Sequence, residues 1–181
     1  MNLPSFQFLR LAEPFPTTIS SPKLDLISLI WDHIAARYLK RLESNRILAG
    51  RVRSIRLLAV HDAIHAVVDP GNGHVFREIA GSSSTEAAYA AVVRASHDIL
   101  VTVFDDPAAI ADLGHLLEES LALTGNEAEK TAGEQTGARS AAAYLATFAP
   151  LLVNHHPVVR RAPVLQPVAR VYAGSGWSRS A

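Results

Sequence analysis

The chain has 181 residues, of which 49% are hydrophobic and 19% are charged, and its formal net charge is zero. This size and composition predict a folded globular domain, and the charge balance gives no overall attraction to nucleic acid or to an acidic membrane surface. Cysteine is absent, which excludes disulfide bonds, thiol catalysis and cysteine-based zinc sites.

The first 20 residues are expected to form an irregular arm. Arg10 lies within their apolar residues, and Pro4, Pro14 and Pro16 interrupt them further. A secretory signal instead carries its positive charge before an unbroken apolar run. No signal peptide is therefore predicted, and the location is cytoplasmic or unassigned.

Two helices are expected in the first half of the chain. Ser21 and Pro22 fit the cap and first position of a helix that runs to about Glu43. Asn45 can cap a second helix, which the turn at 69–73 ends. Apolar residues recur at helical spacing in both: Ile27, Ile30, Trp31, Ile34, Tyr38 and Leu42 in the first, and Leu48, Val52, Ile55, Leu58, Ala59 and Ala66 in the second.

Three further helices are expected after a short extended stretch at Val75 and Phe76. Each begins at a side chain that can accept a hydrogen bond from a backbone N–H of the first turn. These caps are Ser83, with Glu86 completing a capping box, then Asp106 before Pro107, and then Asn126, whose helix runs to about Ala149. The fourth helix is expected to bury Ile110, Leu113, Leu117 and Leu121. The third and fifth are rich in alanine and glycine, which predicts that these two pack closely.

The fold class predicted from these elements is all-α, a bundle of about five helices with an irregular proline-rich tail. The charge is unevenly divided, because residues 1–80 carry +3, residues 81–149 carry −7 and residues 150–181 carry +4. The last segment has four prolines, four arginines and no acid. We therefore expect an arm at 1–20, a bundle at 21–149 and a tail at 150–181.

No membrane span is predicted, although the stretch between Arg139 and Arg160 is uncharged and long enough to be one. Pro150 and Pro157 interrupt it, and the polar residues that follow Val153 would be costly in hydrocarbon.

The sequence His61-Asp62-Ala63-Ile64-His65 is the sharpest local pattern. Two histidines four apart on a helix face the same way and can hold a metal ion, with Asp62 in the place of the glutamate base of zinc proteases. Glu86 is a candidate third ligand, although it also suits a helix cap. The alternative is that His61 and His65 are ordinary polar residues of an amphipathic helix.

A basic stretch spans the first two helices and comprises Arg37, Lys40, Arg41, Arg46, Arg51, Arg53 and Arg56. It can contact phosphates. The spacing of Arg46, Arg53 and Arg56 also describes the solvated face of a helix, and the acidic segment 81–149 offers a partner within the chain. The solvated face is the favoured interpretation, and nucleic-acid binding is not predicted.

Three segments resemble the helical N-terminal part of vanadium-dependent haloperoxidase-related proteins of the type 2 phosphatidic acid phosphatase superfamily. Arg51 with residues 59–70 resembles the family's arginine and the apolar helix after it. Residues 84–104 resemble its alanine-rich helix, and residues 132–142 resemble a later helix with two glycines four apart.

The resemblance implies a helical protein whose relatives bind vanadate or phosphate and catalyse halide oxidation by peroxide or phosphoester hydrolysis. The family binds the oxyanion through a Lys followed by Arg-Pro, a Pro-Ser-Gly-His and a Ser-Arg with a later His and Asp. The first two motifs do not occur in this sequence. Its one Ser-Arg, at Ser178, is followed by only two residues, so the later His and Asp are also missing. No catalytic or cofactor-binding residue is therefore assigned, and vanadate or phosphate is implied only for a catalytic half that this chain lacks.

Three hypotheses follow. The first is the helical scaffold of a haloperoxidase-like or phosphatase-like protein, inactive alone, whose partner is the missing catalytic half. The second is a stand-alone helical module for homo-oligomerisation or interaction with another subunit. The third is a small metal hydrolase that uses His61, Asp62 and His65.

Overall fold

The computed structural model describes residues 21–153 and shows an all-α bundle, as predicted. Its helices are α1 (Pro22–Leu39), a 3-10 helix (Lys40–Asn45), α2 (Arg46–Val68), α3 (Thr85–Val101), α4 (Pro107–Leu121) and α5 (Glu127–Val153). No strand occurs between residues 21 and 153, and Val75 and Phe76 lie in the loop between α2 and α3. The arm at 1–20 and the tail from residue 154 lie outside the described residues.

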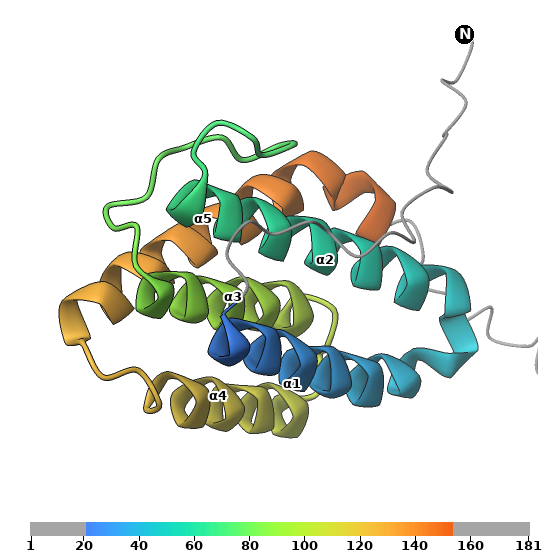
Figure 1. Cartoon of the computed structure of the whole chain (residues 1–181). Helices are drawn as coiled ribbons and strands as arrows, with labels where there is room; N and C mark the ends of the chain where they lie inside the picture. The colour runs from blue at the N-terminus through green and yellow to red at the C-terminus, as the bar shows by residue number, and fades with distance from the viewer. Residues whose placement is uncertain (1–20, 154–181) are drawn as a thin grey trace, which may run out of the picture.

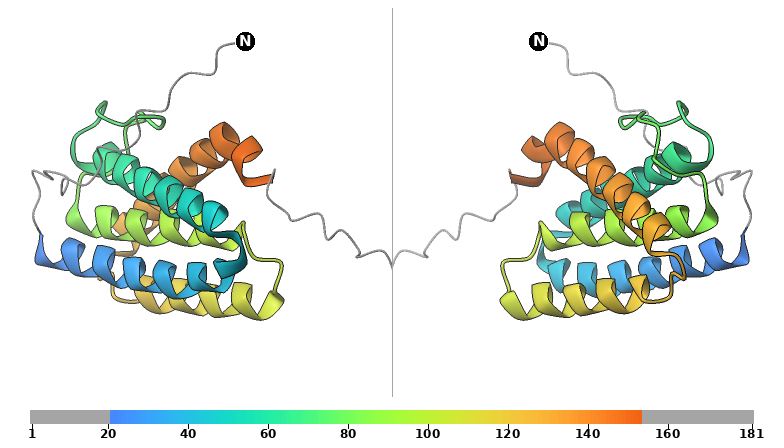
Figure 2. Two further views of the ribbon diagram at one scale, coloured as in Figure 1. Left: turned by 90° about the vertical axis from the view of Figure 1, so that its right-hand side faces the viewer. Right: turned by 90° about the vertical axis from the view of Figure 1, so that its left-hand side faces the viewer.

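Helix α3 is the centre of the bundle. It contacts each of the other α-helices, with α2 and α5 crossing above it and α1 and α4 below it in the views of Figures 1 and 2. Every residue from Ala87 to Val93 is buried. A helix that is apolar on all sides is stable only when it is covered all round, and here four neighbours cover it.

The expected close packing of α3 and α5 is confirmed by two glycines of α5. A Cβ atom at Gly133 would lie 2.2 Å from the carbonyl oxygen of Ala87, and one at Gly137 would lie 2.5 Å from that of Ala91. Both distances are below any real contact, so the two backbones meet without a side chain between them. Glycine is required here because of the approach of the helices.

Helices α1 and α4 attach to the other side of the core through polar contacts of buried aromatic residues. The indole N–H of Trp31 donates to Ser120 Oγ at 3.3 Å, and the Tyr89 hydroxyl donates to the Ser120 carbonyl at 3.1 Å. Tyr38 donates to Asp112 and packs edge-on against Phe104. These contacts satisfy polar atoms that would otherwise be costly to bury.

Three of the predicted side-chain caps lie at the expected residue and one is displaced by one residue. Asn45 accepts from Leu48 N–H at 3.0 Å, and Asp106 accepts from Ala108 N–H at 3.1 Å. The cap of α3 is Ser84, one residue after the predicted Ser83. Asn126 likewise accepts from the first turn of α5.

Two helix ends differ from the prediction. Helix α1 ends at Leu39, not near Glu43, because the chain tightens into the 3-10 helix. Helix α5 continues through Pro150 to Val153. Leu152 packs against the core, and the Leu151 carbonyl accepts a hydrogen bond from Arg51 Nη1 at 3.0 Å, so tertiary contacts hold this last turn.

Three side chains do not lie where the helical pattern places them. Ile110 is 41% exposed and Ile30 is 38% exposed, so neither belongs to the core. Arg56 is buried and not on the solvated face, because Asp32 of α1 pairs with it and Ser96 accepts from its Nη1 at 3.1 Å. Arg46 and Arg53 are exposed, as predicted.

Candidate functional site

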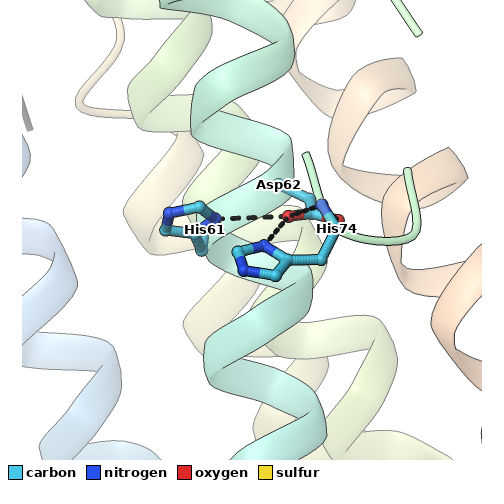
Figure 3. Close-up of side chains that lie close together, drawn as sticks. All are labelled: His61, Asp62 and His74. Carbon is cyan, nitrogen blue, oxygen red and sulfur yellow. Dashed lines mark hydrogen bonds and ion pairs between the residues drawn. The ribbon is translucent and has the colours of Figure 1, made fainter. Parts of the chain in front are cut away.

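The candidate site lies where the second half of α2 meets the loop that follows it. His61, Asp62 and His65 come from α2, and His74 comes from the loop between α2 and α3. Figure 3 shows the rings of His61 and His74 next to each other, each joined by a dashed line to the Asp62 carboxylate. This part of the molecule also contains the one group of three metal-ligating side chains found within residues 21–153, namely His61, Asp62 and His74.

Two glycines shape the loop that carries His74. Gly71 has a φ of 101°, a conformation that other residues rarely adopt. A Cβ atom at Gly73 would lie 1.9 Å from the carbonyl oxygen of Phe76 and 3.2 Å from Cγ of Asp62. The loop can therefore fold back onto Asp62 only with glycine at position 73.

The Asp62 carboxylate holds this loop against α2. It is fully buried and accepts hydrogen bonds from the backbone N–H groups of three successive residues, His74 at 2.9 Å, Val75 at 2.8 Å and Phe76 at 3.0 Å. The hydroxyl of Tyr144 in α5 donates to the same carboxylate at 2.8 Å. One side chain thus joins α2, the loop and α5.

These donors keep the carboxylate ionised. Burial alone raises the pKa of Asp62, but the hydrogen bonds from His61 and from the three backbone N–H groups outweigh it and hold the pKa far below its usual value. The pKa of Tyr144 is raised by burial, by its hydrogen bond to Asp62 and by the charge of that carboxylate. Across the physiological pH range, Asp62 is therefore a charged hydrogen-bond acceptor and Tyr144 is a neutral donor.

Three imidazole rings lie in a row beside Asp62, with His61 between His65 and His74. The ring centres of His61 and His65 are 4.3 Å apart, and those of His61 and His74 are 5.0 Å apart. Nδ1 of His61 lies 3.2 Å from Asp62 Oδ1, and Nδ1 of His74 lies 3.3 Å from the same oxygen. Burial lowers the pKa of His65, and the neighbouring His61 lowers it further, which favours the neutral ring.

An open pocket of about 270 Å³ adjoins the row of histidines between α1 and α2. His61 and His65 line it together with Asp32 and Arg56, and Leu24, Val60 and Ile64 supply apolar surface. Burial lowers the pKa of Arg56, while the charge of Asp32 raises it. The pocket is therefore lined by two imidazoles and by an ion pair in which Arg56 is buried and the Asp32 side chain is 47% exposed.

The structure brings together only part of the predicted set. His61 and His65 share a face of α2, as the spacing predicts, but Asp62 is held by the loop and by Tyr144. Glu86 does not join them as a third ligand. Its carboxylate instead forms an ion pair with Lys23 Nζ of α1 at 2.6 Å.

His74 and Tyr144 were missed by sequence reasoning. Gly71 and Gly73 mark a tight turn around His74, but nothing in the sequence indicates that this turn folds back by 12 residues onto Asp62. Tyr144 lies 82 residues from its partner.

No protein-family model, no curated protein and no solved structure matches this chain. The resemblance of three segments to the haloperoxidase and phosphatase superfamily thus stays a prediction. Among the helices within residues 21–153, none has a run of apolar residues long enough to cross a bilayer.

Proposed function

We propose that this bundle is the helical scaffold of a haloperoxidase-like or phosphatase-like protein and that one face of α1 packs against a second, catalytic helical domain. The family is taken from the resemblance of residues 59–70, 84–104 and 132–142. The family's oxyanion-binding motifs do not occur in the sequence, so the vanadate or phosphate site belongs to that second domain.

The observation that supports the proposal is the apolar outer face of α1. Leu26 is 58% exposed, Leu29 is 54% exposed and Ile30 is 38% exposed, and their spacing of three and four residues places them side by side. The opposite face of α1 is buried, with Ile27, Trp31 and others in the core. A surface helix normally has one apolar face, so the second one indicates a packing surface.

A further exposed leucine lies past the end of α4. Leu123 is 64% exposed, and its carbonyl oxygen accepts a hydrogen bond from Lys23 Nζ at 3.2 Å, which places it beside the start of α1. Covering the exposed half of each leucine contributes about 1 kcal/mol per side chain. Such a face adds a few kcal/mol to an interdomain contact without being essential for the bundle itself.

The experiment combines an activity assay with a surface variant. The purified chain is expected to show no bromide oxidation with vanadate and peroxide and no hydrolysis of p-nitrophenyl phosphate. Binding of an apolar fluorescent dye should fall in the variant Leu26→Gln, Leu29→Gln, with the melting temperature unchanged. The matched control is Ile47→Gln on α2, which removes a side chain that is 63% exposed.

The outcomes separate the competing functions. Turnover that survives His61→Gln, or dye binding equal in the α1 variant and the Ile47 control, contradicts the scaffold proposal. A concentration-dependent dimer that the α1 substitutions dissociate supports the second hypothesis, a homo-oligomerisation module using the same face. The third hypothesis is the least supported, because a hydrolytic base must reach water and Asp62 is buried among donors.

A further inference from the structure

The two oxygens of the buried Asp62 carboxylate are the basis of a separate inference, independent of the scaffold role. Oδ2 accepts hydrogen bonds from the backbone N–H groups of Val75 at 2.8 Å and Phe76 at 3.0 Å, and from the Tyr144 hydroxyl at 2.8 Å. Oδ1 shares the backbone N–H of His74 with Oδ2, at 2.9 Å from each oxygen. Oδ2 therefore holds the loop and α5 in place, whereas Oδ1 is the oxygen presented to the imidazole rings.

Two imidazole nitrogens meet at Oδ1. In Figure 3 the dashed lines from Nδ1 of His61 and from Nδ1 of His74 end on the same oxygen of Asp62. The two distances are 3.2 and 3.3 Å, which are longer than the roughly 2.9 Å typical of an N–H···O hydrogen bond. Two ligand atoms of a tetrahedral zinc ion, each about 2.0–2.1 Å from the metal, lie about 3.3 Å apart. The spacing at Oδ1 is thus the spacing of ligands around one ion.

The three atoms also lie close enough together to share an ion, because all of them are within 4.8 Å of one another. Asp62 and His61 are neighbours on α2, and the carboxylate is fully buried. His74 comes from the loop, and its side chain is 54% exposed. Two of the three atoms are therefore fixed by the helix, and the third lies on the side from which an ion can enter.

We propose that Nδ1 of His61, Oδ1 of Asp62 and Nδ1 of His74 bind one divalent transition-metal ion. Two imidazoles and one carboxylate form a ligand set that suits zinc and related transition metals, whereas magnesium and calcium prefer oxygen ligands alone. The ion takes the place of the two contacts between Oδ1 and the rings and compensates the same negative charge. One tetrahedral position of a zinc ion is left for water.

The bound ion fastens the loop to α2. His74 follows Gly73, the residue that lets the loop approach Asp62, so a metal bond to His74 adds to the backbone hydrogen bonds already made there. His65 is not a ligand, although its ring centre is 4.3 Å from that of His61, because its donor atoms do not belong to the group of three. This difference between neighbouring histidines makes the proposal testable residue by residue.

The test is a calorimetric titration of the full chain, freed of metal by a chelator, with zinc chloride and in parallel with magnesium chloride. We expect one zinc ion per chain and no magnesium binding. His74→Gln should weaken zinc binding at least about tenfold, and circular dichroism should show an intact fold because the lost ring is largely exposed. A native chain that binds no zinc, or that binds magnesium equally well, overturns the proposal.

His115→Gln is the matched control, since His115 is an exposed histidine of α4. Its zinc affinity should equal that of the native chain, and equal affinity in the His74 variant would mean that zinc binds adventitiously, which overturns the site. His65→Gln should also leave the affinity unchanged, and a tenfold loss there overturns the ligand set. Asp62→Asn retains an oxygen acceptor for the loop and should weaken zinc binding as His74→Gln does.

A nitrogen-15 NMR spectrum of the histidine rings identifies the atoms that meet the metal. We expect zinc to shift the Nδ1 resonances of His61 and His74. A metal-induced shift at Nε2 of either ring instead would show that the ion does not lie at Asp62 Oδ1, and the proposed geometry would be wrong. Zinc should also slow hydrogen exchange at the amides of Val75 and Phe76, because the loop must release the ion before it opens.

Discussion

Replacing Asp62 by alanine is expected to destabilise the bundle more than the loss of any other carboxylate described above. The substitution removes a fully buried carboxylate that accepts hydrogen bonds from three backbone N–H groups and from the Tyr144 hydroxyl. Each donor left without a partner costs about 1 kcal/mol when water partly replaces the carboxylate. The four donors together predict a loss of about 4 kcal/mol, a large part of the roughly 5–15 kcal/mol typical of a domain.

Urea unfolding followed by circular dichroism measures this loss. The control is Asp98→Ala on α3, because Asp98 pairs only with the side chains of His97 and Arg94 in the contacts seen, at 2.8 and 2.9 Å, and its side chain is 20% exposed. We expect the control to lose about 1 kcal/mol. If Asp62→Ala costs no more than Asp98→Ala, then water serves the loop donors as well as the carboxylate does, and the reasoning is refuted.

A second substitution isolates the contact with α5. Tyr144→Phe should cost about 1 kcal/mol in the native background and less than half of that in the Asp62→Ala background, because the partner of the hydroxyl is already gone. Hydrogen exchange adds a local readout. The amide protons of His74, Val75 and Phe76 should exchange faster in Asp62→Ala, while those at the centre of α3 change only with global stability.

Three other predictions concern two close backbone approaches at glycines and the buried charge of Asp62. Gly73→Ala should cost about 2 kcal/mol in urea unfolding, since the new Cβ meets the Phe76 carbonyl, whereas Gly81→Ala, with open space around it, should be near neutral. Gly137→Ala should destabilise by about 2 kcal/mol and Gly114→Ala should stabilise α4 by up to about 1 kcal/mol, both read from the melting temperature. The pKa of Asp62 is lower in the folded than in the unfolded chain, so stability should be full above about pH 4 and fall at lower pH; urea midpoints from pH 3 to 7 should show a flatter profile for Asp62→Asn.

The helices could be predicted from the sequence because their signals are local. Asn45, Asp106 and Asn126 cap helices by reaching two or three residues along the chain, and the sequence contains both partners. The glycines at 133 and 137 likewise predicted a close helix contact, since the absence of a side chain is visible in the sequence itself. Their partner, α3, could be chosen because it is the other helix rich in small residues.

The candidate site could be predicted only in part because its defining contacts join residues that are far apart in the sequence. The shared face of His61 and His65 follows from helix geometry. The orientation of Asp62 depends on a loop that returns to it and on a tyrosine of the last helix, and neither contact leaves a periodic signal. Arg56 shows the same limit, because its spacing fits a solvated face and only the position of Asp32 explains its burial.

The central position of α3 has a consequence for the order in which the chain can fold during synthesis. One side of α3 is completed by α5, the last described helix to leave the ribosome, and the same helix brings the Tyr144 hydroxyl to Asp62. A nascent chain that stops before residue 133 therefore exposes the alanine-rich side of α3, a surface that invites association with other chains. We therefore expect the described bundle to complete its native packing only once α5 has been made.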